Sequence, residues 1–177
     1  MKLILNQLSK IPVIKQDTDN VNDLPFIPKK PLPVKNFCFY IVGAPSSGKT
    51  SLIMSLFLSH PTTRNRTENK YYYKFFDIIQ LISASLNTLP LKFTSKIPDD
   101  QKHLNYSDDL LTTILDDLYE NDNTNNCIIL DDVIRDLSKS KILSKLYLNR
   151  RHISHNCEKD CQGSMSIITT SQKYSLL

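Results

Sequence analysis

The chain of 177 residues contains few glycines: Gly43, Gly48 and Gly163. Average usage would give a chain of this length roughly 12. Two of the three lie within one short segment, Gly43 to Gly48. Glycine tolerates backbone conformations and close ligand approach that other residues do not. We therefore expect a glycine-poor chain to need this pair where it stands.

The sequence also lacks a long apolar run. No segment approaches the roughly 18 residues that span a bilayer as a helix, and the run Leu3-Ile4-Leu5 is too short for the core of a secretory signal. The four cysteines (Cys38, Cys127, Cys157 and Cys161) fit small buried thiols better than a disulfide framework. With 40% hydrophobic and 23% charged residues, the chain is neither disordered nor fibrous. We expect one globular domain inside the cell.

Charge is unevenly distributed behind a net value of +4. Residues 99–136 carry eleven acidic and two basic side chains, whereas the segments on both sides are basic. The acidic block excludes a uniformly basic nucleic-acid coat. The basic segments could contact phosphate or could simply be solvated surface.

Proline marks the N-terminal region, where five of the nine prolines precede residue 36. The stretch from Pro25 to Pro33 excludes a helix or a central strand. We predict an extended, proline-rich arm over residues 1–35, followed by one domain over residues 36–177.

That domain alternates apolar, strand-like runs with helical stretches. Strands are predicted over residues 37–42, 75–82, 127–130 and 165–170, the first of them buried on both faces. Helices are predicted over residues 49–60, ended by Pro61, from the N-cap Ser107 onward, and over residues 138–149. This alternation indicates an α/β fold, a mainly parallel sheet flanked by helices.

The two clustered glycines belong to a motif. Residues 43–50 match G-x-x-x-x-G-K-[ST] between a predicted buried strand and a predicted helix, the context that this motif requires. In such a P-loop, backbone N–H groups cradle phosphates, the lysine reaches the β- and γ-phosphates, and the hydroxyl residue binds Mg²⁺. We predict binding of ATP and Mg²⁺, with Thr50 on the metal, by Gly43, Ala44, Pro45, Ser46, Ser47, Gly48, Lys49, Thr50 and Ser51.

Two carboxylates follow the apolar run Cys127 to Leu130. Ligands of open α/β sheets bind at the carboxyl ends of the strands. We assign Asp131 to Mg²⁺, directly or through water, and Asp132 to the general base that deprotonates the attacking water. Three other aspartate pairs lack a preceding apolar strand and are interpreted as caps or solvated helix faces: Asp99-Asp100, Asp108-Asp109 and Asp116-Asp117.

Polar residues also end the last predicted strand. Gln172 is the first candidate, and Thr170 the second, for a side chain that senses the γ-phosphate and positions water. Arg150 and Arg151 end the preceding helix, where they could cap its carbonyls or act as an arginine finger on a neighbouring subunit.

Histidine and cysteine gather just beyond those arginines. The spacing of His152, His155, Cys157 and Cys161 matches no standard zinc site. A polar hairpin that turns at Gly163 is the preferred interpretation.

In this order, the motifs resemble the FtsK–HerA superfamily, especially the genome-packaging ATPases of poxviruses, giant viruses, virophages and Polinton-type elements. The resemblance covers residues 36–175. It rests on Gly43 to Ser51, Phe76-Asp77-Ile78-Ile79 with Ser83-Ala84-Ser85, Leu130-Asp131-Asp132-Val133, Asn149-Arg150-Arg151-His152, and Ile167-Ile168-Thr169-Thr170-Ser171-Gln172.

The resemblance implies a homo-oligomeric ring that uses ATP to drive double-stranded DNA into a preformed capsid. Its partners would be DNA and the proteins of the capsid or portal vertex, in the host cytoplasm, a viral factory or the virion. By position, Asp132 replaces a more usual glutamate, Gln172 matches the sensor glutamine, and Arg150 or Arg151 matches the arginine that acts across subunits.

Two departures from the family stand out. Residues 157–163 resemble an insertion. The family continues into at least one more strand beside the phosphate-loop strand, so we expect a sheet without its last strand or strands. A truncated, a divergent and a split gene product are all compatible with this.

The same residues bear on other functions of P-loop proteins. A GTPase would carry N-K-x-D, but Asn69-Lys70-Tyr71-Tyr72 lacks the aspartate. A small-molecule kinase needs no adjacent acid pair. A helicase or AAA+-like loader stays open, as does a nucleotide-binding assembly component without motor activity of its own.

Overall fold

The structure, a computed structural model, describes residues 32–58, 71–72, 74–120, 124–133, 140–153 and 164–172. In chain order the elements are β1 (Cys38–Val42), α1 (Lys49–Phe57), β2 (Ile78–Ser83), the 3₁₀ helix η3 (Leu86–Thr88), α2 (Leu91–Thr94), the 3₁₀ helix η4 (Asp99–Gln101), β3 (Lys102–His103), α3 (Asp108–Glu120), β4 (Asn125–Asp131), α4 (Lys141–Ile153) and β5 (Ser164–Ser171).

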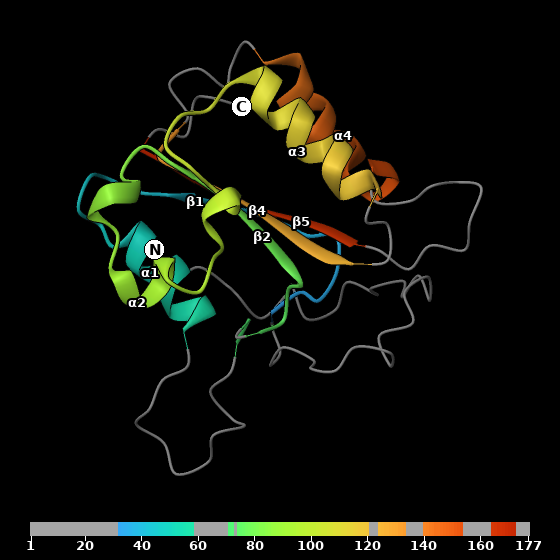
Figure 1. Cartoon of the computed structure of the whole chain (residues 1–177). Coiled ribbons are helices and arrows are strands. Elements are labelled where there is room, and N and C mark those ends of the chain that lie inside the picture. The colour runs from blue at the N-terminus through green and yellow to red at the C-terminus, as the bar shows by residue number, and fades with distance from the viewer. Residues whose placement is uncertain are drawn as a thin grey trace, which may run out of the picture.

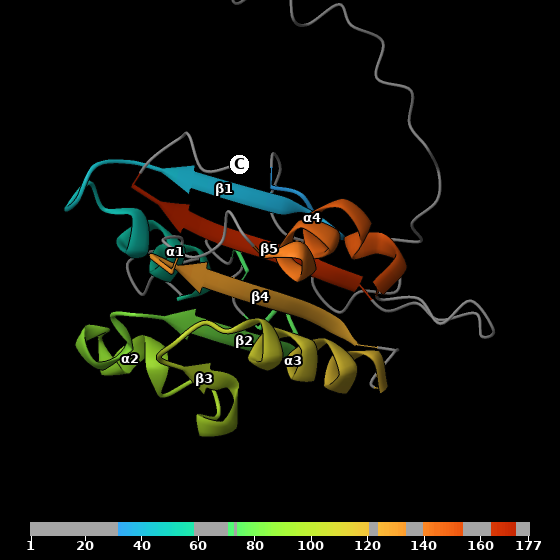
Figure 2. The same ribbon diagram turned by 90° about the horizontal axis from the view of Figure 1, so that it is seen from above.

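The five strands form one sheet in the order β1-β5-β4-β2-β3, and every pairing is parallel (Figure 2). The last strand along the chain, β5, therefore lies between the first strand and β4. All residues of β4 and β5 are buried, as expected of central strands that are covered on both faces. This order brings the carboxyl ends of β1, β5 and β4 side by side.

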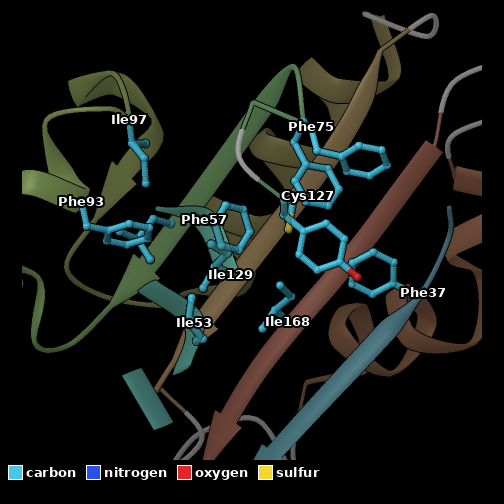
Figure 3. Packing of buried hydrophobic residues seen from close by; sticks show 12 residues of the cluster. Phe37, Ile53, Phe57, Phe75, Phe93, Ile97, Cys127, Ile129 and Ile168 are labelled. Carbon is cyan, nitrogen blue, oxygen red and sulfur yellow. The ribbon is translucent and has the colours of Figure 1, made fainter. Parts of the chain in front are cut away.

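Helices cover both faces of the sheet, with α1 and α2 on one side and α3 and α4 on the other (Figure 1). Successive residues of β4 alternate between the two layers. Cys127 and Ile129 pack toward α1, whereas Ile128 and Leu130 pack toward α3 and α4. The α1 layer is rich in aromatic rings, including Phe57, which stacks on Phe76 at 5.7 Å between ring centroids (Figure 3).

The structure confirms the α/β fold and the main elements expected from the sequence. Ser107 caps α3, because its Oγ accepts the Leu110 N–H at 3.0 Å. Of the described cysteines, Cys127 is buried and Cys38 half-buried, and burial raises the pKa of the Cys127 thiol. Cys157 and Cys161 lie outside the described residues.

Several expectations differ from the structure in detail. The helix predicted over residues 138–149 is α4, which begins at Lys141 and continues to Ile153. The helix from Lys49 ends at Phe57 and not at His60. The strand β1 packs against both layers but is only half-buried, because it is an edge strand of the described sheet. Finally, β3 and the short helices η3, α2 and η4 were not predicted, since two to four residues carry too little periodicity.

The end of the expected N-terminal arm lies on the domain. Leu32 and Val34 pack against the aromatic layer, and the Tyr72 hydroxyl donates to the Pro33 carbonyl at 2.9 Å. Residues 1–31 of the expected arm lie outside the described part of the chain. Among the described helices, none has the length and apolar character needed to cross a membrane.

Candidate functional site

A cavity of about 360 Å³ opens where the carboxyl ends of β4 and β5 meet the first turn of α1. Most of its wall is the predicted phosphate loop, and the rest comes from the acidic strand end, the end of β5 and the loop after β2. The lining residues are Pro45, Ser46, Ser47, Gly48, Lys49, Thr50, Ser51, Ser85, Asp131, Asp132 and Gln172. The strand order creates this convergence, because β5 brings its polar end between the loop and the acids.

The backbone of the loop needs its two glycines. Gly48 caps α1 with φ +85°, a left-handed conformation that side chains disfavour. At Gly43, an added Cβ would lie 2.4 Å from the Ser47 Oγ and 3.2 Å from its Cβ. The Gly43 N–H donates to the Ser171 carbonyl at 3.1 Å, which fastens the start of the loop to the end of β5.

The loop offers a positive, hydrogen-bond-donating wall. The first N–H groups of α1 have no partner within the helix, and the helix dipole adds partial positive charge there. Lys49 adds an ammonium group, whose Nζ donates to the carbonyls of Gly43 at 2.9 Å and Ala44 at 3.0 Å. An ammonium has three donors, so one is left for a ligand in the cavity.

Opposite the loop, Asp131 is 2% exposed and accepts three hydroxyl hydrogen bonds. Thr50 of α1 donates to its two oxygens at 3.1 and 3.3 Å. Ser83 of β2 donates to Oδ2 at 3.2 Å, and Thr170 of β5 donates to Oδ1 at 2.8 Å. The carboxylate is thus held by a helix and by both neighbouring strands. Because the Thr50 proton points at Asp131, the lone pairs of its hydroxyl are free for a cation.

Asp132 begins the loop after β4 and differs from its neighbour. It is exposed at the cavity and has φ +56°, which turns its side chain away from the strand direction. Its N–H donates to the Thr170 Oγ1 at 2.9 Å. Its carboxylate accepts the Gln172 Nε2 at 2.9 and 3.2 Å. The acid and the amide therefore lie together at the mouth of the site.

The structure brings together most of the predicted site residues: the phosphate loop, Asp131, Asp132 and Gln172. Thr170, the second candidate for a side chain that senses the γ-phosphate, is wholly buried behind Asp131 and does not line the cavity. Its hydroxyl donates to Asp131 Oδ1 at 2.8 Å, so Thr170 contacts the acid and not the cavity. Asp108 and Asp109, interpreted as cap residues, stand in the first turn of α3.

The remaining predicted residues are not placed at this site. Arg150, Arg151 and His152 belong to α4, but their side chains are outside the described set, as are His155, Cys157, Cys161 and Gly163 altogether.

From the sequence alone, Ser83 and Ser85 stand only among the residues that carry the resemblance, and no role at the site was predicted for them. Ser83 binds Asp131, and its Oγ accepts the Ser85 N–H at 3.2 Å, which directs Ser85 toward the cavity wall. The available signal was a hydroxyl residue directly after the apolar run of β2, the same pattern that ends β5. A serine after a strand is too common to identify a site without the strand order.

A larger cavity of about 620 Å³ lies near the opposite, amino end of β2. Its lining includes the buried aromatic side chains of Phe57 and Phe93, whose packing Figure 3 shows, and the exposed Lys74 and Lys96. Among the residues that the structure describes, its lining contains no pair of carboxylates and no hydroxyl cluster. The smaller cavity is the better place for chemistry.

Within the part of the chain that the structure describes, no three His, Cys, Asp or Glu side chains lie close enough to hold a metal ion by themselves. A hydroxyl in front of one carboxylate suits Mg²⁺ that arrives with phosphate oxygens and keeps several waters. Comparisons with protein-family models, curated proteins and solved structures found no match to this chain.

Proposed function

We propose that the chain is a P-loop ATPase that binds ATP with Mg²⁺ and hydrolyses the bond between its β- and γ-phosphates. One observation carries the proposal: Thr50, at the start of the helix after the phosphate loop, donates a hydrogen bond to buried Asp131 at the end of β4. That pair of side chains is the one expected to hold Mg²⁺ against a nucleotide in this class of site.

The loop residues supply the binding step. Backbone N–H groups of the loop and the first turn of α1 surround the phosphates. Lys49 exchanges its contacts with two carbonyl oxygens for contacts with phosphate oxygens. Thr50 turns its free lone pairs to the cation, and Asp131 holds that hydroxyl in place. When bound, Mg²⁺ neutralises charge that develops on the phosphate oxygens.

Asp132 and Gln172 supply the hydrolytic step. The oxygen of a water molecule attacks the γ-phosphorus, the bond to the bridging oxygen of ADP breaks, and the water proton passes to the Asp132 carboxylate. Gln172, which lies within hydrogen-bond distance of Asp132, orients the same water through its amide. Both side chains line the cavity, as these roles require.

The resemblance in motif order extends the proposal to a motor that packages double-stranded viral DNA into capsids. In that role the chain would form a homo-oligomeric ring, and Arg150 or Arg151 would act on the ATP of a neighbouring subunit. Host cytoplasm, a viral factory or the virion is the corresponding location. A helicase or loader, and a nucleotide-binding assembly component, are distinguished from the motor by the experiment below.

The test is phosphate release by the full chain in Mg²⁺ and ATP, alone and with double-stranded or single-stranded DNA. We expect turnover that double-stranded DNA stimulates, and loss of turnover in Lys49→Ala, because the phosphates lose their cationic partner. Lys141→Ala, which removes an exposed lysine from α4, is the matched control and should be unchanged.

Other outcomes separate the alternatives. Stimulation by single strands alone would favour a helicase. ATP binding without turnover, even with DNA and capsid proteins, would contradict the motor and favour an assembly component. Absence of ATP binding would contradict the whole proposal.

A further inference from the structure

The carboxylate of Asp131 is nearly saturated with hydrogen bonds before any ligand is considered. A carboxylate offers about four acceptor positions. Three hydroxyls, those of Thr50, Ser83 and Thr170, occupy three of them at 2.8 to 3.3 Å. Since the side chain is also 2% exposed, little of it is available for a metal ion to approach directly.

Two of the three hydroxyls do not touch the cavity. Ser83 and Thr170 are both wholly buried, and they flank Asp131 from the two neighbouring strands. The Thr170 hydroxyl also accepts the backbone N–H of Asp132. One hydroxyl thus contacts the Asp131 carboxylate and the Asp132 backbone. Their shared feature is that they fix the direction of the carboxylate without reaching the reacting atoms.

We propose that Ser83 and Thr170 are positioning residues that turn Asp131 into a water-mediated metal partner and thereby select Mg²⁺ over larger cations. The inference rests on the proposed function, since it concerns the same site. Mg²⁺ dehydrates reluctantly and keeps several waters, whereas Ca²⁺ accepts direct and flexible carboxylate contacts. A carboxylate whose oxygens are occupied by hydroxyl protons favours the hydrated ion.

The test uses Thr170→Val, which keeps the shape of the side chain and removes the hydroxyl. Binding of a fluorescent ATP analogue to the full chain is titrated with Mg²⁺, Mn²⁺ and Ca²⁺. Loss of an outer-shell partner costs about 10- to 100-fold in metal affinity. We expect the half-saturating Mg²⁺ concentration to rise about tenfold, with a smaller rise for Ca²⁺, and Thr170→Ser to restore the wild-type values.

Thr169→Val is the matched control. Thr169 is the preceding residue of β5, is equally buried and bonds Tyr147 of α4 on the other face of the sheet. Its loss should lower stability without changing metal preference. Ser83→Ala tests the other flank, should shift metal preference in the same direction, and serves if Thr170→Val does not fold.

The outcomes separate the two claims. If the wild-type chain binds the analogue with Mg²⁺ while folded Thr170→Val or Ser83→Ala retains the wild-type ratio of Mg²⁺ to Ca²⁺ half-saturation, the positioning role is wrong and the proposed function stands. If the wild-type chain shows no metal-dependent nucleotide binding, both the proposed function and this inference are wrong.

Discussion

The two ends of the central strands β4 and β5 are both polar and buried, yet they are built differently. At the amino end, Asn125 donates its amide to the Phe75 carbonyl at 2.9 Å, and its backbone N–H donates to Asp77 at 2.8 Å. Ser164 donates to the Asn125 amide oxygen. At the carboxyl end, hydroxyls from three elements converge on the charged Asp131.

The two ends differ in the hydrogen-bonding groups that remain available to a ligand. At the amino end, the side chains of Asn125 and Asp77 bond backbone groups, and Ser164 bonds the Asn125 side chain, so the network ties β4 to β5 and to the segment before β2. At the carboxyl end, a lysine donor, the lone pairs of Thr50 and two exposed side chains still face a cavity. Buried polar side chains alone therefore do not indicate a functional site. Donors and acceptors that face a cavity do indicate one.

The largest effect is expected at the carboxyl end, from Asp132→Asn. The amide cannot take the proton of the attacking water, and loss of a general base costs about 10²- to 10⁴-fold. Phosphate release at saturating ATP and Mg²⁺ measures the loss, while nucleotide affinity should stay near wild type. Asp116→Asn, an exposed position on α3, is the matched control. Wild-type turnover in Asp132→Asn would remove this residue from the reaction.

At the amino end, Asn125→Ala should have a smaller effect, and it should lower stability without changing ATP binding. The change leaves the buried Phe75 carbonyl without its donor, which costs about 1–3 kcal/mol in the free energy of unfolding. Urea denaturation measures the loss, and ATP affinity of the folded variant should be unchanged. Asn87→Ala, at an exposed position of η3, should be neutral. Loss of ATP affinity in folded Asn125→Ala would contradict a purely structural role of the amino end.

The smallest effect is expected at the edge strand β3. Burial lowers the pKa of His103 despite the opposing charge of Asp100, and its ring bonds Gln80 at 3.0 Å. A lowered pKa in the folded state contributes stability above the unfolded pKa of about 6.5 and loses it as the pH falls. Between pH 7 and about 5.5, the melting temperature of His103→Gln should therefore decline less than that of wild type. An equal decline of the melting temperature in both proteins would contradict a lowered pKa of His103 in the folded state.

Much of the fold was predictable because its central elements are long apolar runs with strong turn and cap residues. The loop between β1 and α1 was predictable because the spacing of Gly43, Gly48 and Lys49 matches a turn between a strand and a helix, with Gly48 in the left-handed conformation at the helix cap. The insertion of β5 beside β1 was not, since strand order is decided by contacts between residues far apart in sequence. The hydrogen bonds from Ser83 and Thr170 to Asp131 depend on that order, which is why the sequence alone did not predict them.

The central claim is that the carboxyl end of the sheet binds the phosphates of ATP through Lys49, Thr50 and Asp131. Calorimetric titration of ATP into the full chain, with Mg²⁺ and with a chelator, tests it most directly. We expect one bound nucleotide per chain, tighter binding with Mg²⁺ than without, and loss of binding in Lys49→Ala but not in Lys141→Ala. Binding that is indifferent to both Mg²⁺ and Lys49, or no binding at all, would contradict it.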